Sequence, residues 1–106
     1  MDEKHPMSVK LIMTWDIASD HEQEYFEFVI GEFIPGVQRL GFQPVEAWAT
    51  MYGNYPQIQV GMLAEDLPVA QRILRADGWI QLQTKLLTLV KNFSYKVVPA
   101  RSGFQF

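Results

Sequence analysis

The sequence has no cysteine among its 106 residues and no long apolar run. Without cysteine, the protein cannot be a disulfide scaffold, and thiolate metal sites and cysteine nucleophiles are excluded. No apolar run approaches the roughly 18 residues that a membrane-spanning helix needs, and the first residues do not have the pattern of a signal peptide. We therefore expect a cytoplasmic protein that does not enter a membrane.

Basic residues are also scarce, with 9 Lys and Arg against 12 Asp and Glu and a net charge of −3. Broad electrostatic binding to nucleic acid is therefore not expected, and the basic, aromatic motifs of RNA-recognition sheets are absent. The two histidines, His5 and His21, lie outside every predicted strand. Because histidine is the usual axial ligand of haem and a common zinc ligand, we predict no metal and no cofactor.

The apolar residues that are present alternate with two different periods. A period of two predicts strands, and a period of about 3.6 predicts helices. The pattern gives strands over 9–16, 44–52, 57–62 and 93–98, and helices over 20–40, 67–76 and 78–91.

Three residues mark features of these helices. Asp66 is a candidate N-cap for the second helix, and Asp77 for the third. Pro35 lies inside the first helix, where it has no amide hydrogen to donate and crowds the carbonyl of Gly31. We therefore expect a kink near Gly31.

The resulting order, βαββαβ, predicts an α+β fold. Right-handed crossovers and an antiparallel central hairpin are satisfied by a ferredoxin-like, four-stranded antiparallel sheet of order 4-1-3-2 with the helices on one face. One domain over residues 8–99 follows, with tails at 1–7 and 100–106.

Residue parity divides the strands between two faces of this sheet. One face is almost wholly apolar and is expected to lie under the helices. The other face mixes polar groups with Ile12, Trp48, Tyr52, Leu63 and Val98. Such a mixture suits a surface covered in part by a second copy of the chain or by a ligand.

Three stretches of the chain carry a family resemblance. They are the short first strand Val9–Asp16, the long first helix with Phe33-Ile34-Pro35-Gly36, and Ala76-Asp77-Gly78-Trp79 with the last strand after it. The chain resembles the dimeric α+β barrel superfamily, in particular NIPSNAP-like and antibiotic-biosynthesis-monooxygenase-like members. The resemblance implies a homodimer with its two sheets face to face and a ligand site in the interior. It also implies a choice among cofactor-free oxygenases, isomerases and proteins without an assigned activity.

The mixed face supplies the candidate site. A pocket is expected between the two sheets of a dimer, or between the sheet and the first helix. Asp16 is the candidate catalytic base, because it ends a strand beside the loop into the first helix. The candidate ligand-binding residues on the same face are Thr14, Trp48, Tyr52, Gln59 and Lys96.

Two functions remain open at this point. The first is a homodimeric binder of a small apolar or aromatic compound, including a cofactor-independent oxygenase or isomerase. The second is a non-catalytic dimerisation or accessory module with a filled barrel interior, in which the candidate residues satisfy one another across the interface.

Overall fold

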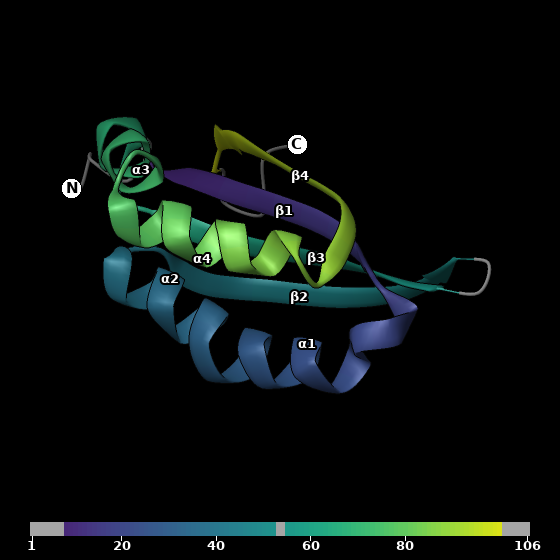
Figure 1. Cartoon of the computed structure of the whole chain (residues 1–106). Coiled ribbons are helices and arrows are strands. Elements are labelled where there is room, and N and C mark those ends of the chain that lie inside the picture. The colour runs from purple at the N-terminus through teal and green to yellow at the C-terminus, as the bar shows by residue number, and fades with distance from the viewer. Residues whose placement is uncertain (1–7, 53–54, 101–106) are drawn as a thin grey trace.

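One antiparallel sheet with helices on one face makes up the part of the chain that the computed structural model describes, residues 8–52 and 55–100 (Figure 1). The predicted tail over 1–7, and residues 101–106 of the C-terminal tail, lie outside it. The strands are β1 (Val9–Ile17), β2 (Gln43–Tyr52), β3 (Tyr55–Ala64) and β4 (Val90–Pro99). They run in the order β2-β3-β1-β4, and all neighbours are antiparallel. This is the predicted order 4-1-3-2 read from the other edge, so the ferredoxin-like α+β fold is confirmed.

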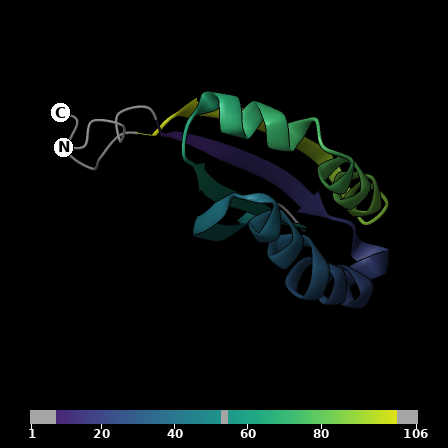
Figure 2. The same cartoon turned by 90° about the vertical axis from the view of Figure 1, so that its left-hand side faces the viewer.

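The helices fall into two groups, which lie side by side on the sheet (Figures 1 and 2). The first group, which we call helix one, comprises η2 (Ser19–His21), α1 (Glu22–Phe28), η3 (Val29–Phe33) and α2 (Ile34–Leu40). The second group is α3 (Leu67–Leu74) and α4 (Asp77–Leu87).

Aromatic side chains fill the space between the helices and the middle of the sheet. Every second residue of β1 is buried, and Leu11, Met13 and Trp15 are fully enclosed. The Trp15 ring meets Phe33 of helix one edge-on, with 6.0 Å between ring centroids. Trp79 of α4 is also buried. The core therefore holds the sheet and both helix groups together.

Helix one changes its hydrogen-bond register near the predicted kink. Residues Val29–Phe33 form a π-helical turn, and the Ile34 N–H donates to the Val29 carbonyl five residues back. Pro35 follows at once, in the first turn of α2. The regular α-helical pattern is thus interrupted near Gly31, where the sequence predicts a kink, and the proline has no N–H to continue the ladder. The interruption is a wider turn within a continuous helix.

Two details of the helices around residue 77 differ from prediction. Asp66 caps α3 as expected, with the Val69 N–H donating to its Oδ1 at 2.9 Å. Asp77 is no cap, because α4 starts at Asp77 and its N-cap is Ala76, which makes no side-chain capping bond. Helix α4 then ends at Leu87 and β4 begins at Val90, three residues earlier than predicted. Asn92 takes a positive φ of 57°, which accompanies an irregular register between β1 and β4.

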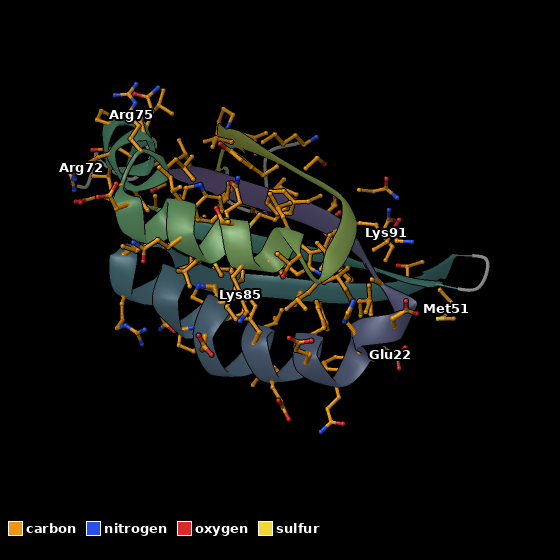
Figure 3. All side chains as sticks on the ribbon, viewed as in Figure 1. Glu22, Met51, Arg72, Arg75, Lys85 and Lys91 are labelled. Atoms are coloured by element: carbon orange, nitrogen blue, oxygen red, sulfur yellow. The ribbon has the colours of Figure 1, made fainter. Side chains whose placement is uncertain are left out.

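The expectation that the apolar face lies wholly under the helices is wrong for β2. This strand is at the edge of the sheet, and its hairpin with β3 extends beyond the helices (Figure 1). The inner row of β2 is exposed: Val45 at 46% and Met51, towards the hairpin end, at 68% (Figure 3). Ala47 and Ala49 between them are also exposed. A stretch of the inner sheet face is therefore open beside helix one.

Candidate functional site

We call the face of the sheet that carries no helices the open face. It brings several of the predicted site residues into register. Trp48 of β2 is paired with Gln59 of β3, Gln59 with Thr14 of β1, and Thr14 with Ser94 of β4. These four residues therefore form one row across the whole sheet. Residues paired across antiparallel strands share a face, so the predicted parity holds here despite the register shifts near Pro44 and Asp16.

A shallow hollow of about 390 Å³ lies on this face. The hydroxyl oxygens of Thr14 and Ser94, which both line the hollow, are 3.1 Å apart, so the two groups are within hydrogen-bond distance. The hollow is lined by Ile12, Thr14, Gln59, Ser94, Tyr95 and Lys96. Three of the predicted ligand-binding residues, Thr14, Gln59 and Lys96, are thus brought together.

The other predicted residues lie apart from this hollow. Asp16 accepts a hydrogen bond at 2.7 Å from the Asn92 side-chain amide, and it is paired in register with Lys91. Trp48 is 58% exposed on the edge strand. The side chain of Tyr52 is outside the part of the chain that the structure describes. Asp16 therefore has a hydrogen-bond partner, Asn92, on the open face. Trp48 is exposed, so a second molecule could contact it.

A second cavity, of about 440 Å³, lies on the opposite face between helix one and the β2–β3 half of the sheet. We call it the helix–sheet cleft. Its lining is Trp15, Val29, Ile30, Ile34, Pro44, Val45, Glu46, Ala47, Ile58 and Val60. This is the second of the two predicted pocket locations, but none of the predicted site residues Thr14, Asp16, Trp48, Gln59 and Lys96 lines it.

The helix–sheet cleft offers a ligand almost no polar side-chain group. The indole N–H of Trp15 already donates to the Tyr25 hydroxyl at 2.8 Å. Burial raises the pKa of Tyr25, and the bond from Trp15 partly opposes this effect. Among the described residues of the lining, Glu46 is the only ionisable one, and its carboxylate accepts a hydrogen bond from the Lys10 ammonium group at 3.3 Å. The cleft is therefore suited to a neutral, apolar compound.

The sequence predicted a pocket between the sheet and the first helix, but it did not identify the residues that line this cleft. Ala47 and Ala49 fall in the apolar row of β2, and the small side chain of Ala47 forms part of the cleft lining. This was the available signal. The missing information was the position of helix one, which is set by tertiary packing rather than by local pattern.

Within residues 8–52 and 55–100, no group of three or more histidine or acidic residues is placed to hold a metal ion. In the same ranges no helix is both long and apolar enough to cross a membrane. The cytoplasmic location stays a prediction.

Comparison with known proteins gives the fold a context. No protein-family profile and no curated protein sequence matches the chain. Solved structures do match: a NIPSNAP-like domain protein from Burkholderia xenovorans has a TM-score of 0.67 at 17% identity, covering 92% of this chain and 89% of that one. SnoaB, a cofactor-independent oxygenase from Streptomyces nogalater, has a TM-score of 0.65 at 16% identity, covering 93% of this chain and 98% of that one. Hydroxynitrile lyase from Passiflora edulis has a TM-score of 0.74 at 7% identity, covering 93% of this chain and 98% of that one. The predicted likeness to NIPSNAP-like and monooxygenase-like proteins is thus confirmed for the fold.

Proposed function

We propose that the protein is a homodimer that binds a small apolar or aromatic compound in the helix–sheet cleft. The observation that carries this is the cleft itself, about 440 Å³ in volume with an apolar lining from helix one and the sheet. Small-molecule sites usually have volumes of about 300–1,000 Å³ and predominantly apolar walls. Leaving this surface in water has a free-energy cost, which a bound apolar compound would remove.

The open face is the proposed dimer interface. It exposes Trp48, and Ile12 and Val98 are only partly covered. Its charges are partly neutralised within the chain, because Lys10 is paired with Glu46. A twofold axis would cover this face with its own copy, and prior pairing of charges lowers the desolvation cost of covering them.

The catalytic form of this proposal is a cofactor-independent oxygenase or isomerase. SnoaB supports it only through its fold and its description as a cofactor-independent oxygenase. Asp16 is the base candidate, and it lies on the open face, away from the cleft lining. A reacting compound that uses Asp16 would therefore bind between the two sheets, near the hollow of Thr14, Gln59 and Lys96.

Thermal-shift titration with 1-naphthol, a neutral aromatic compound, separates these locations. A ligand at 100 times its dissociation constant stabilises its receptor by about 2.7 kcal/mol. Val45→Asp places a charge in the cleft, and it should abolish the shift. Asp16→Asn, Trp48→Ala and Lys96→Ala should keep it. If Val45→Asp keeps the shift and the three open-face variants lose it, the ligand binds between the two sheets of the dimer instead.

The alternative is a non-catalytic dimerisation or accessory module. Its support is that open-face groups satisfy one another, as in the Thr14–Ser94 and Lys10–Glu46 contacts. This alternative predicts a dimer whose melting temperature does not respond to 1-naphthol or to a wider panel of neutral aromatic compounds.

A further inference from the structure

We propose that the π-helical turn Val29–Phe33 determines the ligand selectivity of the helix–sheet cleft, an inference that rests on the proposed ligand site. Three cleft-lining residues come from this turn or directly follow it: Val29, Ile30 and Ile34. Single π-helical turns inside α-helices are frequent at functional sites. The spacing of the buried residues shows why the turn is there.

Four buried residues of helix one recur every four positions: Tyr25, Val29, Phe33 and Val37. An α-helix turns about 100° per residue, so each step of four drifts by about 40°. In an unbroken α-helix Val37 would point about 120° away from Tyr25. The π-helical turn accommodates one extra residue and removes this drift. Phe33 and Val37 can therefore be buried in the same core as Tyr25.

The extra residue must project on the side away from the core. Ile30 is 69% exposed although it lines the cleft. Gly31 is exposed, and a Cβ added to it would have nothing within 4 Å outside the local helix. The π-helical turn thus determines the position of Ile30, which forms part of the cleft wall opposite β2.

Deletion of Gly31 should change the cleft wall and spare the core. In the shortened chain the buried residues would follow steps of four, three and four, which is the repeat of a regular α-helical stripe. Tyr25, Val29, Phe33 and Val37 could then stay buried in a helix without the π-helical turn. Gly31→Ala is the matched control, because it keeps the extra residue.

The experiment measures dissociation constants for two neutral probes of different size. N-phenyl-1-naphthylamine is titrated by fluorescence, and naphthalene by competition with it. We expect the ratio of the two constants to change by about tenfold or more on deletion of Gly31, the scale on which apolar pockets discriminate size. Gly31→Ala should leave the ratio unchanged. Ile30→Ala, which shortens the wall and keeps the turn, should change it.

The outcomes are separable. A folded deletion variant with the parent's ratio would overturn the selectivity role and leave the proposed function standing. If the deletion variant fails to fold, Ile30→Ala and Ile34→Ala decide, and an unchanged ratio in both would refute the inference. A parent that binds neither probe would overturn the proposed ligand site, and the inference with it.

Discussion

Lys10 of β1 and Glu46 of β2 form an ion pair of 3.3 Å although β3 lies between their strands. The residue of β3 paired with Glu46 is Gly61. A Cβ on Gly61 would lie 2.8 Å from both Cγ and Oε2 of Glu46. The absence of a side chain at this position therefore lets Glu46 lie across β3 and reach Lys10.

Gly61→Ala should break this contact by displacing Glu46. The pair is only part-buried, so we expect a loss of about 1 kcal/mol or less in the free energy of unfolding, measured by urea denaturation. A double-mutant cycle of Lys10→Met and Glu46→Gln in both backgrounds should show coupling only in the parent. Gly31→Ala, where the added methyl group meets open space, is the control. Equal coupling in the Gly61→Ala background would contradict this account of Gly61.

The proposed dimer predicts a mass of twice 12.3 kDa by light scattering on a size-exclusion column at micromolar protein. Trp48→Glu places a charge in the proposed interface and should give a monomer. Leu87→Glu is a matched control, because Leu87 is 46% exposed on α4, on the helix face of the sheet. A monomeric parent, or equal dissociation by both variants, would argue against the open face as the interface.

The buried hydroxyl of Tyr25 predicts a loss of stability at alkaline pH. Burial holds the pKa of Tyr25 above its ordinary value, which is about 10. Above that pH the unfolded chain releases the tyrosine proton while the folded protein retains it. The free energy of unfolding should therefore fall as the pH rises above about 10.

Tyr25→Phe tests this account in two ways. It leaves the buried Trp15 N–H without its acceptor, which should cost about 1–3 kcal/mol at pH 7 in urea unfolding. It should also reduce the decline of stability above about pH 10. Tyr95→Phe, at a tyrosine that is 42% exposed, serves as the control. An unchanged alkaline slope in Tyr25→Phe would show that another group causes the decline.

Much of this fold is predictable because local and long-range patterns agree. Alternation along β1 places Leu11, Met13 and Trp15 in the core, and all three are fully buried. The same parity brings Thr14, Gln59 and Lys96 to one hollow. These inferences need only the period of a strand and the order of the elements.

The helix–sheet cleft was harder to predict because it depends on how helix one packs beside an edge strand. Val45 and Met51 have the parity of core residues, yet both are exposed on β2, and the hairpin end that carries Met51 extends past helix one. An edge strand and a central strand can show the same alternation of apolar residues, so the sequence pattern does not distinguish them. Only the packing of helix one against Trp15 and Trp79 decides which apolar residues remain open.

Pro35 alone does not account for the π-helical turn, and this gives the last prediction. Pro35→Ala restores an N–H that could complete an α-helical ladder. One such bond contributes about 1 kcal/mol net. Closing the ladder would rotate Phe33 and Val37 away from the core, at a cost of about 1.5–3 kcal/mol for each exposed side chain.

The turn should therefore persist in Pro35→Ala. NMR scalar couplings across hydrogen bonds should still join the Ile34 N–H to the Val29 carbonyl, and the free energy of unfolding should change by about 1 kcal/mol or less. Deletion of Gly31 is the positive control, because it should produce the α-helical pattern. An α-helical ladder through residues 29–36 in Pro35→Ala would show that the proline, rather than the four-residue spacing of buried side chains, maintains the turn.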